Sequence, residues 1–256
     1  MDNSETMKAW ADNWSPHSVS EVMSIFGYIR VKRLLTIFRE LLPVEGKILE
    51  GGCGLGPWVI KLRELGYDVT GVDYDTASIG KIKEYDPIIP AYVADVNSMP
   101  FENNTFDAYM SLGVLEHFVE GPQEAIEEAR RVMKSDGLFL ITLPYLNLLL
   151  RVKRPYERLK RIGWVRGLLG KEQKVFYYER YFNVREICNY LEAGGFEVEE
   201  IKPIDHIFSF VSFSRIFRDK MSYDGENDLA VKAADIFGKI LPWGIAGSML
   251  IAARKK

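Results

Sequence analysis

Short apolar, β-branched runs alternate along the chain with segments of helical periodicity. Seven runs are predicted to be strands, at 47–50, 68–72, 91–94, 106–111, 138–143, 196–201 and 248–253. Predicted helices between them span 58–65, 77–84, 123–133 and 184–193. The last helix precedes Gly194 and Gly195, and glycine is a common helix stop. Strands joined by crossover helices build a mostly parallel sheet, so the pattern predicts an α/β fold.

The remaining segments predict how the rest of the chain is organised. Apolar residues recur at helical spacing over 19–42 and end at Pro43, which predicts a helical N-terminal cap over 1–46. A core over 47–144 follows, with insertions at 145–195 and 202–247 that are longer than simple connections require. If the seventh strand runs antiparallel to the sixth, both insertions leave the carboxyl edge, where such sheets bind ligands. We expect a single domain over 1–256 with a helical substrate lid; outer packing or a dimer interface is the alternative.

Composition and charge narrow the class of protein. With 256 residues, of which 47% are hydrophobic and 27% charged, the chain can bury a full core. Its net charge of −3 gives no support to broad nucleic-acid binding. Cys53 and Cys188 form neither a metal-ligand pattern nor a disulfide framework. The first ten residues lack signal-peptide features, and no apolar run reaches the roughly 20 residues of a membrane span. We expect a cytoplasmic protein.

A glycine cluster, "EGGCGLGP", separates the first predicted strand from the first helix of the core. Glycines there let backbone N–H groups and the helix N-terminus approach a ligand closely. The dinucleotide motif G-x-G-x-x-G fits poorly, because Pro57 or Cys53 occupies a required glycine position. The stretch instead has the form acid-x-G-x-G-x-G, made by Glu50, Gly52, Gly54 and Gly56. Pro57 follows where the first turn of a helix tolerates a missing N–H.

This stretch resembles motif I of the class I S-adenosylmethionine-dependent methyltransferases, which have a Rossmann-like, doubly wound fold. Later segments match that family in order and spacing: "VTGVDYD", "AYVADVNSMPF" and "EEARRVMKSDGLFLITLP". Together they cover about 47–144, and 196–201 with 248–256 complete the sheet. The resemblance implies a seven-stranded, mostly parallel sheet with an antiparallel seventh strand, and S-adenosylmethionine as the cofactor.

The resemblance also implies roles for individual residues. Asp73 matches the acid that accepts hydrogen bonds from the ribose hydroxyls, and Asp95 matches the residue that accepts one from the adenine amino group. Glu50 resembles the acid near the methionine amino group. The full predicted set of cofactor contacts is Glu50, Gly52, Cys53, Gly54, Gly56, Asp73, Tyr74, Asp95, Val96 and Leu112. Each of these residues also has a purely structural interpretation. Asp73 could cap a helix, Asp95 could end a strand, Glu50 could hydrogen-bond the loop, and Cys53 could be a small core residue.

Methyl transfer requires little beyond placing the acceptor in line with the methyl group, so a general base is optional. His117 follows the fourth predicted strand, where substrate is expected, and histidine titrates at a pH suited to deprotonating a hydroxyl or an amine. The alternative is a histidine packed in the first turn of a helix. Glu116 is interpreted as a supporting or helix-start acid, and no metal site is expected. Tyr145, Tyr177 and Tyr178 either line the pocket or pack.

The sequence thus predicts an S-adenosylmethionine-dependent methyltransferase for a small-molecule or lipophilic acceptor. A noncatalytic S-adenosylmethionine-binding protein and, less favoured, a nicotinamide-dependent oxidoreductase remain as alternatives.

Residues 145–174 hold nine Lys or Arg against two Glu, a net of +7, with Leu159, Ile162 and Val165 at helical spacing. This composition predicts peripheral contact with an anionic membrane; a solvated lid and a site for an anionic substrate are its rivals. Nucleic acid is disfavoured, because aromatic stacking motifs are lacking. Phe208, Phe210, Phe213 and Phe217 wall a pocket or complete a core.

Overall fold

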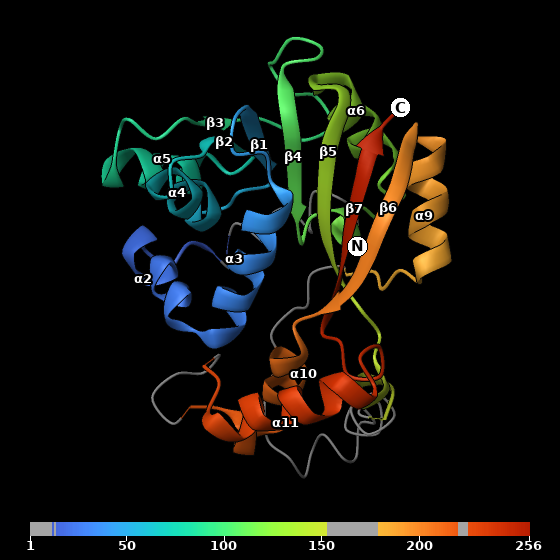
Figure 1. Ribbon diagram of the computed structural model, residues 1–256. Coiled ribbons are helices and arrows are strands. Elements are labelled where there is room, and N and C mark those ends of the chain that lie inside the picture. The colour runs from blue at the N-terminus through green and yellow to red at the C-terminus, as the bar shows by residue number, and fades with distance from the viewer. Residues whose placement is uncertain (1–11, 13, 153–178, 220–224) are drawn as a thin grey trace, which may run out of the picture.

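The computed structural model describes residue 12 and residues 14–152, 179–219 and 225–256 (Figure 1). Within them, seven strands form a sheet of order β3-β2-β1-β4-β5-β7-β6. The bounds are β1 Lys47–Gly51, β2 Asp68–Asp73, β3 Ala91–Val93, β4 Phe106–Leu112, β5 Met133–Pro144, β6 Phe196–Ile204 and β7 Ser248–Lys255. Strand β7 pairs antiparallel with β5 and β6, and the other pairings are parallel. The predicted sheet, with its antiparallel seventh strand, is confirmed.

Helices cover both faces of the sheet. Helices α4 (Pro57–Glu64) and α5 (Thr76–Tyr85) lie on one face, whereas α6 (Gln123–Val132) and α9 (Val184–Ala193) lie on the other (Figure 1). Successive residues of a strand point to opposite faces; accordingly, Ile48 belongs to the core under α4 and α5, and Leu49 to the core under α6 and α9. Two apolar cores thus enclose the sheet and hold the carboxyl ends of its parallel strands at one edge.

The described part of the predicted N-terminal cap is helical but interrupted. It consists of α2 (Val19–Met23), a 3-10 turn η1 (Ser24–Gly27) and α3 (Ile29–Leu41). Ser18 and Glu21 form a reciprocal capping box at the start of α2. The rings of Phe26 and Phe38 lie 5.0 and 4.8 Å from that of Trp58 on α4. These aromatic contacts fix the cap against the helix that follows the glycine cluster.

The second insertion builds a small helical unit below the sheet (Figure 1). Its elements are α10 (His206–Phe213), η3 (Arg215–Phe217) and α11 (Asp228–Ile240). Phe210 is buried, and its ring lies 5.1 Å from Phe217 and 6.0 Å from Phe237. Phe210 and Phe217 therefore complete a local core, which was one of the two readings of these aromatics.

Several element boundaries differ from the sequence prediction, and the largest difference lies at the junction of α6 and β5. The helix predicted to reach residue 133 ends at Val132, and β5 begins directly at Met133. A register shift in the β4–β5 pairing lets residues 134–137 bulge out before regular pairing resumes at Leu138.

The predicted basic amphipathic helix falls mainly on residues 153–178, outside the described residues, as do Tyr177 and Tyr178. No helix in the described part of the chain has the length and hydropathy needed to cross a membrane.

Candidate functional site

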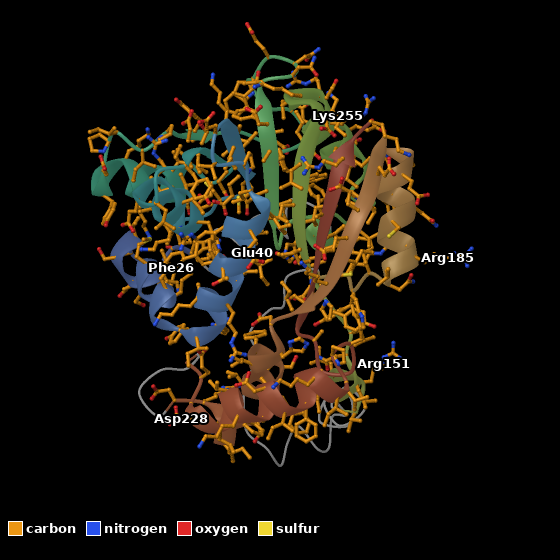
Figure 2. The ribbon with its side chains drawn as sticks, viewed as in Figure 1. Phe26, Glu40, Arg151, Arg185, Asp228 and Lys255 are labelled. Atoms are coloured by element: carbon orange, nitrogen blue, oxygen red, sulfur yellow. The ribbon has the colours of Figure 1, made fainter. Side chains whose placement is uncertain are left out.

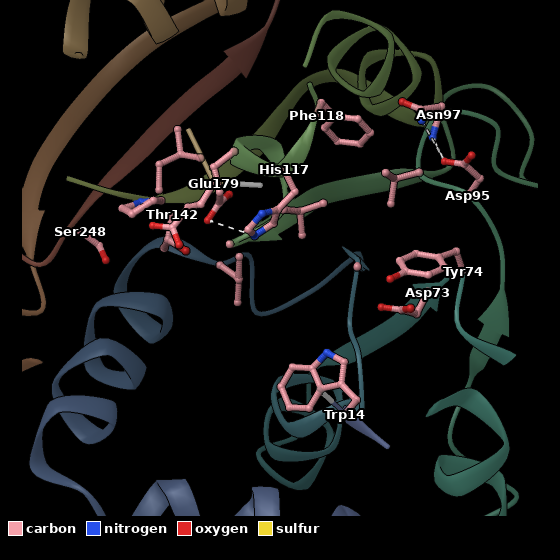
Figure 3. Close-up of a pocket in the computed structure, with 18 of the residues that line it drawn as sticks. Trp14, Asp73, Tyr74, Asp95, Asn97, His117, Phe118, Thr142, Glu179 and Ser248 are labelled. Carbon is pink, nitrogen blue, oxygen red and sulfur yellow. Dashed lines mark hydrogen bonds and ion pairs between the residues drawn. The ribbon is translucent and has the colours of Figure 1, made fainter. Parts of the chain in front are cut away.

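A cavity of about 470 Å³ opens at the carboxyl edge of the sheet (Figure 3). Its walls come from the loops after β1, β2, β3 and β4, from the end of β5 and from the start of β7. Doubly wound sheets bind ligands at this edge. Residues predicted for a cofactor site that line the cavity are Gly52, Asp73, Tyr74, Asp95, Val96 and Leu112.

The glycine loop leads from β1 into α4 through left-handed backbone. Gly52, Gly54 and Gly56 have φ values of +74°, +53° and +68°, which residues other than glycine rarely adopt. A Cβ on Gly52 would lie 2.5 Å from Val114 Cγ2. Glycine is therefore required here both by the backbone conformation and by the close approach of the loop after β4.

The amides of this loop bond within the protein. The N–H groups of Gly52 and Cys53 both donate to the Val72 carbonyl, at 2.8 and 2.9 Å, and the Gly56 N–H donates to the Cys53 carbonyl at 2.8 Å. The Gly54 N–H donates to Asp73 Oδ2 at 2.8 Å. The sequence predicted loop amides that face a ligand. Three of these four amides instead fix the loop against β2, and the Gly56 amide closes a turn within the loop.

Asp73 joins this loop to the turn that follows β2. Its Oδ1 accepts the Asp75 N–H at 2.9 Å, while Oδ2 accepts the Gly54 N–H. The side chain lines the cavity although the residue is only 6% exposed, and burial raises the pKa of its carboxyl group. The cap of α5 is Asp75, which accepts from the amides of Ala77 and Ser78. Asp73 is therefore not a helix cap.

Asp95 lies two residues beyond the end of β3 at Val93, and not at the end of the strand itself. Its Oδ1 accepts hydrogen bonds from the backbone N–H and the side-chain amide of Asn97, at 2.9 and 3.0 Å (Figure 3). Sequence reasoning missed Asn97 as a cavity residue, although the D-x-N spacing is typical of such a turn. This turn holds the Asp95 carboxylate at the cavity wall.

Glu50 and Cys53 are part of the predicted cofactor set, but neither lines the cavity. Glu50 is 3% exposed, and its Oε2 has no hydrogen-bond partner among the described residues. Burial raises the pKa of Glu50 to about 8, against an opposing hydrogen bond from the Val59 backbone. Cys53 is a buried member of the core, as its alternative interpretation held, and burial raises the pKa of its thiol.

At the end of the cavity away from Asp95, the lining includes carboxyl groups and the imidazole of His117. The 3-10 turn η2 (Leu115–His117) follows β4, and both Glu116 and His117 line the cavity. His117 Nε2 lies 3.8 Å from Glu116 Oε1. Burial, with a smaller contribution from nearby Glu179, raises the pKa of Glu116 to about 8. An acid–imidazole pair of this kind can bind and move a proton.

Figure 3 shows how the cavity divides. Tyr74, Asp95 and Asn97 lie at one end, and His117, Thr142, Glu179 and Ser248 gather at the other. Sequence analysis did not predict Thr142, Glu179 or Ser248, nor Trp14, which also lines the cavity. In the described part of the chain, no group of three or more His, Cys, Asp or Glu is arranged to hold a metal ion.

Comparison with known proteins identifies the core. Residues 49–141 match the model of the methyltransferase domain family. A protein of Mycolicibacterium smegmatis named as a probable S-adenosylmethionine-dependent methyltransferase is 25% identical over 159 residues, covering 62% of this chain and 55% of the relative. The demethylmenaquinone methyltransferase of Paenarthrobacter aurescens is 30% identical over 123 residues, 48% of each chain. The chain thus spans about half the length of these relatives.

Solved structures agree on the fold. An S-adenosylmethionine-dependent methyltransferase of Methanosarcina mazei superposes with a TM-score of 0.59 at 20% identity, covering 86% of this chain and 96% of that one. The geranyl diphosphate C-methyltransferase of Streptomyces coelicolor, solved with S-adenosyl-L-homocysteine, gives 0.54 at 14% identity, covering 88% and 76%. At these identities the likeness shows the fold alone. With the domain match over residues 49–141, we conclude that the core of the chain is a methyltransferase domain with this fold.

Proposed function

We propose that this chain transfers the methyl group of S-adenosylmethionine to a small-molecule or lipophilic acceptor. One observation carries the proposal: Gly52, Asp73 and Asp95, from the loops after three neighbouring strands, all line one cavity at the carboxyl edge. Its volume of about 470 Å³ lies in the range of small-molecule sites. We assign the remaining wall, around His117, to the acceptor.

The residues present fit the cofactor. Each carboxylate oxygen has two lone pairs, so Asp73 can accept ribose hydroxyls while it keeps the two amide bonds that fix it. Asp95, oriented by Asn97, is the proposed adenine contact. Gly52 brings backbone to the wall where a side chain would collide with Val114. Glu50 Oε2, buried without a partner among the described residues, is the acceptor we assign to the methionine ammonium group.

The chemistry asks the chain to position the acceptor and to take a proton. When bound, the cofactor supplies an electrophilic methyl group. The chain's contribution is to hold the acceptor in line with it, because alignment alone supplies a large part of the rate. We assign the proton to His117, whose side chain is 13% exposed and lines the cavity.

A turnover assay separates an enzyme from a binding protein. Formation of S-adenosylhomocysteine is measured with S-adenosylmethionine and a panel of metabolites and lipids. With an acceptor that turns over, His117→Ala should lower the rate by about 10² or more and leave cofactor affinity nearly unchanged. His17→Ala, which alters an exposed histidine elsewhere, is the control. Firm cofactor binding without turnover of any acceptor would favour the noncatalytic alternative, and equal rates in the two variants would give His117 a structural role.

A lipophilic acceptor is favoured by the surface of α11. Leu229, Ile236 and Ile240 are each 50% to 66% exposed and share one face at helical spacing, whereas Ala230 and Ala234 on a different face of the helix are buried. Asp228 and Arg151 lie at the same end of the molecule, away from Lys255 (Figure 2). We propose that this apolar face contacts an anionic membrane, since residues 145–174, which include Arg151, carry a net charge of +7 by sequence.

A further inference from the structure

The cavity is acidic at both ends. Its described lining contains four carboxyl side chains, Asp73, Asp95, Glu116 and Glu179, and no lysine or arginine. The proposed function uses Asp73 and Asp95 for the cofactor. Glu179 belongs to the other end with His117 (Figure 3), and so does Glu116, whose Oε1 lies 3.8 Å from His117 Nε2. That end therefore offers carboxyl groups and no basic side chain, among its described residues, to whatever lies beside the cofactor's methyl group.

Glu116 is the buried member of this pair. It is 4% exposed, and its Oε2 has no hydrogen-bond partner among the described residues. The charged groups around it are His117 on the same turn and Glu179 and Arg180 from the segment before α9. The Arg180 backbone N–H donates to the Glu116 carbonyl at 2.9 Å, but its guanidinium pairs with Glu186. A buried carboxyl group left in this way is costly unless a ligand satisfies it.

We infer that the acceptor carries a protonatable amine, which Glu116 binds as the ammonium ion before His117 removes a proton from it for methyl transfer. This inference rests on the proposed function and names its substrate class. An ammonium group supplies both the positive charge and the hydrogen-bond donors that the acidic end lacks. Acceptors that carry a carboxylate or a phosphate beside the reacting atom are disfavoured, because like charges would meet in a water-poor site.

The proton and electrons balance as follows. The ammonium group, held by the Glu116 carboxylate, gives one proton to His117, whose Nε2 lies 3.8 Å from Glu116 Oε1. The freed nitrogen lone pair forms a bond to the methyl carbon, and the carbon–sulfur bond breaks with its electron pair staying on sulfur. The product is the methylated ammonium ion, and the proton leaves His117 to solvent.

Binding of matched probes tests this inference without turnover. n-Octylamine and octanoate, which share one hydrocarbon chain length, are titrated calorimetrically into protein loaded with S-adenosylhomocysteine. The amine should bind the wild type at least tenfold more tightly than the carboxylate. Glu116→Gln should abolish that preference, while Glu120→Gln, which alters an exposed acid four residues away, should keep it.

The pH profile distinguishes an ionising partner from a structural one. With a pKa of about 8, Glu116 is mostly protonated in the amine-free cavity at neutral pH and must lose its proton to pair with ammonium. Affinity for n-octylamine should therefore rise by about tenfold or more between about pH 6 and pH 8 in the wild type and stay flat in Glu116→Gln. Unchanged affinity of Glu116→Gln for S-adenosylhomocysteine shows that the variant is folded.

Three results would overturn the inference. The first is that the wild type shows no preference for the amine, or binds neither probe. The second is that the preference survives in Glu116→Gln. The third is that Glu116→Gln binds S-adenosylhomocysteine more weakly, which would assign this carboxyl group to the cofactor. Failure of the wild type to bind S-adenosylhomocysteine at all would instead refute the proposed function, so the two failures can be told apart.

Discussion

At the scale of single residues, the site depends on carboxyl groups held away from water without a basic partner. Glu50 and Glu116 are 3% and 4% exposed, and burial raises the pKa of each to about 8. Asp73 differs because two backbone amides donate to its oxygens and lower its pKa, against the larger effect of burial. The carboxyl groups proposed to bind ligands therefore lower the free energy of unfolding of the ligand-free protein.

This cost makes stability depend on pH. Because the folded-state pKa of Glu50 exceeds its ordinary value of 4.5, its contribution to the unfolding free energy is complete below about pH 4.5 and is lost as pH rises through about 8. Glu50→Gln removes the ionisation, so its melting temperature, measured without ligand, should fall less between about pH 5 and pH 8 than that of the wild type. Glu40→Gln, in an exposed position on α3, is the control. Identical pH profiles for all three proteins would contradict the assignment.

At the scale of elements, the cavity wall is set by how β1 enters α4. Gly56 is the left-handed N-cap of α4, and Pro57 occupies the first helical position, where its missing N–H costs nothing. The loop between them is tied to β2 through the Val72 carbonyl and Asp73. The sequence pattern correctly predicted a strand, a glycine turn and a helix, but not the hydrogen bonds that close the loop on itself.

Gly52→Ala tests this tight junction. The new Cβ would lie 2.5 Å from Val114 Cγ2 at a φ of +74°, so we expect a loss of about 1–3 kcal/mol in unfolding free energy and weaker cofactor binding. Gly80→Ala is the matched control, because it lies in α5 with nothing within 4 Å of the added atom. Alanine there should stabilise by about 0.5–1 kcal/mol. Denaturant unfolding measures both; equal effects at the two positions would contradict the account.

The apolar face of α11 gives a second prediction at this scale. Cosedimentation should show the wild type bound to anionic vesicles and less bound to neutral ones. Replacing Ile236 and Ile240 together by Ser should weaken binding by about tenfold or more, since burying each side chain is worth roughly 1.5–3 kcal/mol. Ile88→Ser is the control, because Ile88 is 81% exposed on a different part of the surface. Wild-type protein that stays in the supernatant with anionic vesicles at low salt would refute membrane contact.

At the scale of the whole molecule, long-range contacts assemble what the sequence predicts only in parts. Glu226, just before α11, accepts hydrogen bonds from the Ile29 and Arg30 backbone N–H groups at the start of α3. Its Oε2 lies 3.3 Å from Arg30 Nε. The N-terminal cap and the second insertion are therefore joined directly, although nearly 200 residues separate them in sequence.

Separation along the sequence also limits which features could be predicted from the sequence. Local periodicity predicted the seven strands and four core helices, because buried strands and amphipathic helices leave short-range patterns. Asp73 and Asp95 were found through motifs adjoining strands. Trp14, Thr142 and Ser248 reach the cavity from distant parts of the chain, and the pairing of β5 with β7 brings Thr142 and Ser248 to the same edge. Buried Glu50 likewise gave no sign that its Oε2 would lack a partner.

Calorimetric titration with S-adenosylmethionine tests the central claim most directly. We predict that the wild type binds S-adenosylmethionine and S-adenosylhomocysteine, and that Asp73→Ala and Asp95→Ala each weaken binding by about 1–3 kcal/mol through lost hydrogen bonds. Asp235→Ala, which removes a half-exposed carboxylate on α11, should bind as the wild type does. Firm binding of NADH with none of S-adenosylmethionine would contradict the account.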